Sequence, residues 1–241
     1  MKKIATAMLA LVVVGSLAYL GWRWVHGVTV EEVIVRGIER ADSSAVAALA
    51  GIEIGGPMLE VSPEIASDRV RRHPWVERAS VSRQPTGSVI VSVREREPVA
   101  LALDRNGRPA YYLDAKGFRM PVSGRPAGDL PIFRGIREAY HPVQPLENEA
   151  LLGLLAILPE MEDLQDALLS EVHDTAAGIE IHTAVTPAGQ SVRVRLGRTD
   201  LARKLDLLEA YWLQQVLTRP TIQYDWLDLR FRDQVVARER A

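Results

Sequence analysis

Histidine and carboxylate side chains are the residues of this chain that could do chemistry. The five histidines stand at positions 26, 73, 141, 173 and 182, and none is at metal-ligand spacing from another donor. The aspartates and glutamates are too dispersed to single out a catalytic pair, and no G-x-S-x-G, P-loop or H-E-x-x-H pattern occurs. Cysteine is absent, which excludes disulfides and thiolate chemistry. We therefore expect no enzyme activity, cofactor, metal or small-molecule substrate.

A second group of chemically active side chains is a basic cluster in the first third of the chain. It consists of Arg69, Arg71, Arg72, Arg78 and Arg83. Neighbouring acids, Asp68 and Glu77, partly offset it, so a solvated face is one interpretation. The other is a docking surface for a second protein or for anionic lipid. The formal net charge of −2 argues against nucleic acid as a partner.

The elements that position these residues begin with an uncharged run, Ile4–Trp22. As a helix its 19 residues would reach about 28 Å, close to the thickness of a hydrocarbon core. Lys2 and Lys3 precede it, so residues 1–3 are expected in the cytoplasm, residues 4–22 as a single anchor and the rest outside. Ser16-Leu17-Ala18 leaves open a cleaved signal peptide. Either interpretation exports the body of the protein.

Residues 28–97 predict a strand, two short helices and two further strands. The strands are expected at 28–36, 75–83 and 88–97. Asp42 is placed to cap the first helix, which Gly51 closes, and Ser62 with Pro63 begins the second. This β-α-α-β-β order makes one small domain.

Residues 98–241 predict a second domain of mostly antiparallel strands with two helices, giving an α+β fold overall. Asn106-Gly107 favours a type I′ hairpin, and residues 121–135 a loop with few elements. Helices are expected from Pro145 to Pro159 and after the cap Thr199-Asp200, and further strands at 169–173, 178–185, 191–196, 221–231 and 235–238.

Several short motifs give the chain a family resemblance. In the first domain they are Val35-Arg36-Gly37, His73-Pro74-Trp75-Val76 and Arg94-Glu95-Arg96-Glu97-Pro98, and in the second they include Tyr112-Leu113-Asp114, Leu196-Gly197-Arg198 and Asp228-Leu229-Arg230-Phe231. The first set resembles a POTRA domain. The whole chain, with its short tail and anchor, resembles the FtsQ/DivIB family of cell division proteins.

The resemblance implies a non-enzymatic scaffold in the bacterial inner membrane, with its bulk in the periplasm and a place at the division septum. It also implies FtsB-like and FtsL-like partners, the first adding a strand to the free edge of the final strand. The residues expected to bind it are Arg230, Phe231, Val235, Val236 and Ala237, with Arg230 pairing a partner carboxylate. Ala176-Ala177 stand where relatives can carry arginine, which puts an ion pair there in doubt.

The residues support this edge independently, because no later element follows the last strand to cover it. Proline at Val236 is expected to abolish partner binding while the domain stays folded, because it removes an edge donor and distorts the strand. The alternative function is an envelope protein-transport or chaperone component. Such proteins usually carry repeated POTRA modules or a C-terminal barrel, and neither pattern is found here.

Overall fold

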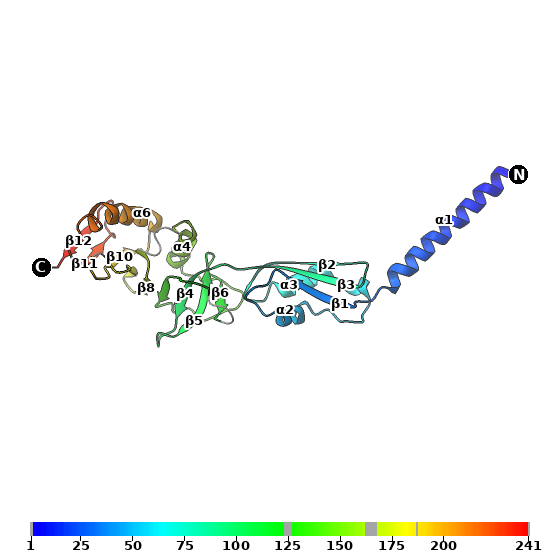
Figure 1. The fold of residues 1–241 in the computed structure, drawn as a ribbon, viewed down its shortest axis with the longest axis horizontal. Helices are drawn as coiled ribbons and strands as arrows, with labels where there is room; N and C mark the ends of the chain where they lie inside the picture. Colours follow the sequence, from blue (N-terminus) through cyan, green and yellow to red (C-terminus); the bar gives the residue numbers. More distant parts are fainter. Residues whose placement is uncertain (1, 123–126, 162–167, 187, 241) are drawn as a thin grey trace. The chain divides into compact units, whose positions relative to one another are not determined.

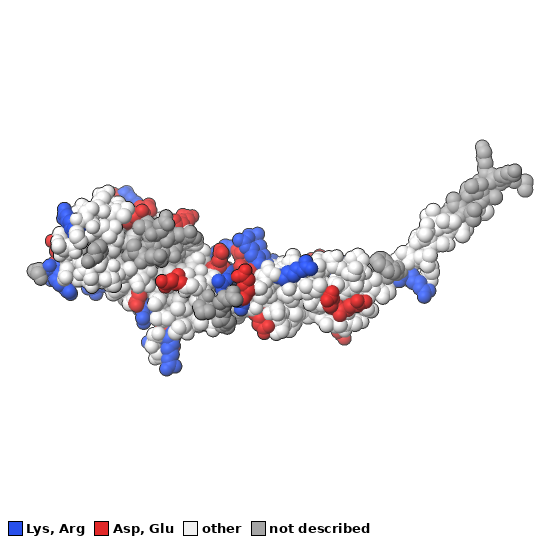
Figure 2. Space-filling view, in the orientation of Figure 1, with Lys and Arg blue, Asp and Glu red and all other residues white. Residues whose placement is uncertain are grey.

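The computed structural model describes residues 2–122, 127–161, 168–186 and 188–240. The chain divides into two compact units, Met1–Glu95 and Arg96–Ala241 (Figure 1). On the face drawn in Figure 2, basic and acidic side chains are scattered over both units.

The uncharged run at the start of the chain lies within one helix, α1 (Lys2–Gly27). Its described apolar side chains are exposed, among them Leu11, Val14 and Leu20. Within the part of the chain that the structure describes, no helix is both long enough and apolar enough to cross a membrane.

The first unit then has the predicted order of elements. They are β1 (Glu32–Arg36), α2 (Ser43–Ala50), the 3₁₀ turn η1 (Met58–Glu60), α3 (Pro63–Val70), β2 (Val76–Arg83) and β3 (Ser88–Glu95). The strands form a sheet in the order β1-β3-β2, with β1 parallel and β2 antiparallel to β3. Both predicted caps are confirmed: Asp42 accepts from Ser44 N–H, and Ser62 accepts from Ile65 N–H.

Two buried clusters hold this unit together. One packs α2 and α3 on the sheet and consists of Val46, Ala50, Ala66, Val70, Val76, Val91 and Val93. The other is smaller and joins Val30, Met58 and Val89, fastening the segment around η1 to the same sheet. Alternate residues of β3 are buried, as expected for a sheet covered on one face.

The second unit is built on a nine-stranded sheet in the order β12-β11-β10-β9-β8-β7-β4-β5-β6. Its strands are β4 (Pro98–Leu103), β5 (Pro109–Asp114), β6 (Arg119–Pro121), β7 (Ile132–Arg134), β8 (Glu171–Thr175), β9 (Gly178–His182), β10 (Arg193–Gly197), β11 (Tyr224–Asp228) and β12 (Val236–Glu239). The helical elements are α4 (Glu149–Ile157), η2 (Leu158–Glu160), α6 (Leu201–Tyr211) and the π-helical turn η3 (Trp212–Val216).

β7 lies inside the segment expected to be a loop, and it joins the two halves of the large sheet. It pairs in parallel with β4 on one side and with β8 on the other. A strand of three residues is too short for its alternation of apolar and polar side chains to be recognised from sequence. Its one fully buried side chain is that of Phe133. The loop is expected over residues 121–135, and residues 123–126 of it lie outside the described residues.

Three local predictions in this unit are wrong. The β4–β5 turn is not type I′, because Gly107 has positive φ but Asn106 does not. The carboxylate of Asp104 accepts from the backbone of Asn106 and of Arg108 and so favours another turn. α4 begins after Asn148, whose side chain caps it, rather than at Pro145. Asp200 has φ 55° and makes no side-chain cap to α6.

α6 lies on the large sheet through the stripe expected from the sequence. Leu205, Leu208 and Trp212 are buried, and they share one core with α4 and the inward residues of the strands. In Figure 1, α6 lies beside β11 and β12, next to the C-terminus. The core therefore supports the last two strands from one face.

Candidate partner-binding edge

β12 forms one end of the nine-stranded sheet and pairs with β11 in antiparallel fashion. Just after it, Arg240 N–H donates to the carbonyl of Gln223 over 2.8 Å. The register shift between Tyr224 and Trp226 adds a residue to β11 and none to β12. Backbone hydrogen bonds therefore alternate without a break along β12, and the N–H groups of Arg238 and Val236 also point toward β11. The same register places Val236 opposite Asp228.

The alternation directs the backbone of Ala237 and Glu239 away from the sheet. Among the described residues no strand lies on that side of β12, so these groups are open to a further strand. This alternation turns the N–H of Val236 toward β11, so proline at Val236 would also affect the ladder with β11. The residue to test is Ala237.

The side chains of the predicted site divide between the two faces of β12. Val235 and Ala237 are half-buried and pack against the core under α6. Val236 is exposed, and Phe231, in the loop before the strand, leaves 53% of its surface exposed. Phe231 and Val236 are therefore free to contact a partner without disturbing the core.

Arg230 is already paired within the chain. Its guanidinium donates to both carboxylate oxygens of Asp228, over 2.6 Å to Oδ2 and 2.9 Å to Oδ1. The carboxylate is nearly buried, at 4% exposed, and the hydrogen bonds from Arg230 lower the pKa of Asp228. Arg195 makes a longer ion pair with the same carboxylate, with 3.9 Å between its Nη1 and Asp228 Oδ2. A partner carboxylate would have to share Arg230 with Asp228.

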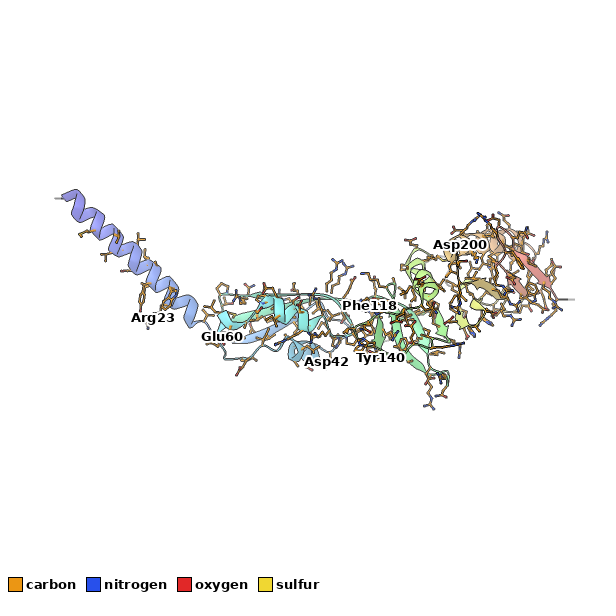
Figure 3. The ribbon with its side chains drawn as sticks, turned by 180° about the vertical axis from the view of Figure 1, so that it is seen from behind. Arg23, Asp42, Glu60, Phe118, Tyr140 and Asp200 are labelled. Carbon is orange, nitrogen blue, oxygen red and sulfur yellow. The ribbon has the colours of Figure 1, made fainter. Side chains whose placement is uncertain are left out.

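A shallow hollow of about 330 Å³ adjoins this loop at the start of α6. Its lining residues are Thr199, Asp200, Arg203, Lys204, Leu207, Arg230, Phe231, Arg232 and Asp233. Arg203 pairs with Asp233, and the ammonium of Lys204 donates to the carbonyl of Leu196 over 2.7 Å. Figure 3 labels Asp200 beside this helix start. The hollow combines one exposed aromatic ring with several cations.

Sequence reasoning missed Asp228 and Arg203, which fix the position of Arg230 and of the loop at Asp233. The i, i+2 spacing of Asp228 and Arg230 within the motif Asp228-Leu229-Arg230-Phe231 was the available signal. Arg203 could not be found in this way, because its partner Asp233 lies 30 residues further along the chain.

The turn at Ala176-Ala177 lies next to an arginine from another element, Arg198. Arg198 donates to the carbonyl of Thr175 over 2.8 Å and lies 3.4 Å from the carboxylate of Asp174. Its side chain remains 46% exposed. A cation therefore stands next to this turn although the turn itself supplies none.

The other candidate groups show structural pairings. His173 and His182 stack at 4.7 Å between ring centroids, and His173 Nε2 lies 2.9 Å from Glu171 Oε2. Burial is the main cause that lowers the pKa of His182. No group of three or more potential metal ligands is found among the described residues. In the basic cluster, Arg71 pairs with Asp68 and Arg83 donates to the Leu59 carbonyl.

The two units match two neighbouring family models. The model described as "POTRA domain, FtsQ-type" matches residues 28–96, and "FtsQ/DivIB, C-terminal related" matches residues 97–238. Fold and matches together define a POTRA-bearing protein with a second, larger sheet domain.

Known relatives make the assignment more specific, and each is named "Cell division protein FtsQ". The protein of Rhodothermus marinus is 42% identical over 228 residues, covering 94% of this chain and 83% of the relative. That of Salinibacter ruber is 35% identical over 241 residues, covering 99% and 93%, and that of Geotalea daltonii is 28% identical over 236 residues, covering 94% and 82%. The chain belongs to the FtsQ/DivIB family of cell division proteins.

Proposed function

We propose that the protein is a non-enzymatic scaffold of the bacterial divisome that binds a small FtsB-like partner by strand addition to β12. An FtsL-like protein joins through that partner, and the complex connects to septal peptidoglycan synthesis. The observation that supports the proposal is the outer side of β12, where no strand of the described residues pairs with the backbone of Ala237 and Glu239. Family membership favours this role over protein transport.

The shape of the edge suits a short, specific partner strand. β12 has only four residues, and Arg238 and Glu239 place charges along it. Charged, short edges resist indiscriminate pairing, so affinity must come in part from side chains. Phe231, Val236 and the cations around the hollow at α6 supply apolar and charged contacts next to the strand.

We further propose that α1 anchors the protein in the inner membrane, with residues 28–241 in the periplasm. The uncharged run Ile4–Trp22 and the exposed apolar side chains of the helix support this anchor. Lys2 and Lys3 support a cytoplasmic N-terminus.

Imaging of a fluorescently tagged copy during depletion of the native protein tests the division role. We expect septal accumulation of the tagged protein, and filamentous cells when it is withheld. A uniform envelope signal with normal division would contradict the scaffold role.

Proline at Ala237 tests strand addition directly. Ala237→Pro removes an outward donor that no described neighbour uses, so the domain should keep its fold while partner binding falls at least tenfold. Binding to the partner's periplasmic segment is measured by calorimetry, and folding by circular dichroism. Val236→Pro is the matched control, because it breaks a bond to β11 and should destabilise the domain itself. Unchanged affinity in a folded Ala237→Pro variant would rule out this edge.

A further inference from the structure

The loop between α2 and α3 is fastened to the residues that immediately follow α1. Met58 N–H donates to the carbonyl of Val28 at 3.0 Å, Val30 N–H to that of Gly56 at 2.9 Å, and Gly55 N–H to that of Val30 at 2.7 Å. Val28 follows the last residue of α1, Gly27. The loop is therefore held at the end of the domain where the chain arrives from the helix.

The chain allows little separation between this loop and the proposed anchor. Gly27 lies five positions after Trp22 in the helix, a rise of about 7.5 Å. This is close to the depth of a headgroup layer, which is roughly 5–8 Å on each side. Val30 lies three residues further, at most about 11 Å along an extended chain. In Figure 3, Glu60 is labelled at this end of the domain and Asp42 toward the opposite end.

Two large apolar side chains project from the fastened loop. Ile54 is 66% exposed and occupies the second position of a tight turn, in which Gly56 N–H donates to Glu53 O and Gly55 has φ 89°. Leu59, in η1, is 44% exposed, although the preceding Met58 is buried against Val30 and Val89. The loop is thus anchored in the core from beneath while two aliphatic groups face solvent.

Charge decides which kind of surface these side chains fit. Glu53 and Glu60 are exposed and flank the two apolar groups, and Arg83 donates to the Leu59 carbonyl at 3.3 Å. Arg69 lines the same pocket as Glu53 and Glu60. Two carboxylates against the two guanidiniums of Arg69 and Arg83 leave no net positive charge to attract anionic headgroups. A contact with lipid must therefore be apolar and shallow, with the carboxylates remaining at the headgroup level.

We propose that the turn at residues 53–56 and η1 form a lipid-contact surface of the POTRA domain, in which Ile54 and Leu59 enter the interfacial layer of a zwitterionic bilayer. This inference rests on the proposed anchoring by α1. Such a contact would fix the distance and tilt of the domain relative to the membrane, with α1 and the loop as two attachment points.

Site-directed spin labelling of the full-length protein in nanodiscs of phosphatidylethanolamine and phosphatidylcholine tests the contact. The chain has no cysteine, so single labels can be placed by Ile54→Cys, Leu59→Cys, Val13→Cys in α1 and Ser43→Cys at the exposed start of α2. Relative accessibility to oxygen and to a water-soluble nickel chelate gives the sign of the depth parameter. We expect lipid-like values at 54, 59 and 13, and a water-like value at 43.

The controls separate this inference from the anchor. Water-like values at 54 and 59 with a lipid-like value at 13 would overturn the contact and leave the anchor intact. A water-like value at 13 would overturn the anchor, and the inference with it. A contact at 54 that forms only when phosphatidylglycerol is added would be electrostatic and would overturn the apolar surface proposed here.

Discussion

At the scale of residues, Phe231 and the pair Asp228–Arg230 have different roles although they are neighbours. The aromatic ring is exposed, whereas the carboxylate is nearly buried and holds the guanidinium in place. Substitution of Phe231 should affect partner binding, and substitution of Asp228 should affect the local fold. The two side chains thus offer separate tests of the same loop.

Phe231→Ala should weaken partner binding by about tenfold to a hundredfold, which is typical for a central aromatic contact. Stability should change by less than about 0.5 kcal/mol, because the ring is exposed. Leu213→Ala is the control, since Leu213 is 49% exposed in the same unit but belongs to η3 and not to β12 or the loop before it. A larger loss from single changes at Arg69–Arg83 would move the interface to the POTRA domain.

Asp228 should make the stability of the second unit depend on acid pH. Its pKa is lowered in the folded state, so its stabilising effect is complete above the ordinary value of 3.8 and is lost as the pH falls through the lower folded value. Urea unfolding of Asp228→Asn should therefore differ from the parent at pH 7, and the difference should shrink below pH 4. Asp206→Asn, exposed on α6, should follow the parent throughout. A difference that persists unchanged at low pH would contradict the assigned ion pair.

At the scale of elements, the end of β7 depends on a glycine. Gly135 has φ 81°, and a Cβ there would lie 2.3 Å from the carbonyl oxygen of Asp174 in β8. The backbone cannot give way without disturbing the parallel β7–β8 pair that joins the halves of the sheet. Both the positive φ and the close approach of Asp174 require glycine at position 135.

Gly135→Ala should therefore destabilise the second unit by about 3 kcal/mol or more, the sum of left-handed strain and a backbone clash. Gly189→Ala isolates the strain alone, because Gly189 has φ 80° with no atom within 4 Å of the added Cβ. It should cost about 1–2 kcal/mol. Denaturant unfolding measures both, and equal losses would show that the β8 contact has no part in the effect.

At the scale of the whole molecule, each unit has its own buried core. The clusters around Val91 and Met58 lie within the first unit, and the cluster around Leu155 lies within the second. A fragment of residues 96–241 should therefore fold alone, with a cooperative thermal transition by circular dichroism. A fragment without such a transition would show that the second unit needs the first.

The sequence alone determined the order of elements in the first unit, the main stripe of α6 and the last two strands. These follow from local causes: the caps at Asp42 and Ser62, the helical spacing of Leu205 and Leu208, and β-branched alternation. The family resemblance also came from sequence, and the matches confirm it. The partner-binding residues remain predictions.

Tertiary structure decided what depends on residues far apart in the chain. It placed the three-residue β7 between β4 and β8, paired Arg203 with Asp233, and turned the Val236 N–H inward and the Ala237 N–H outward. A strand pattern identifies which side chains share a face. The direction of each backbone donor is set by the register with the neighbouring strand, and only the folded sheet fixes that register.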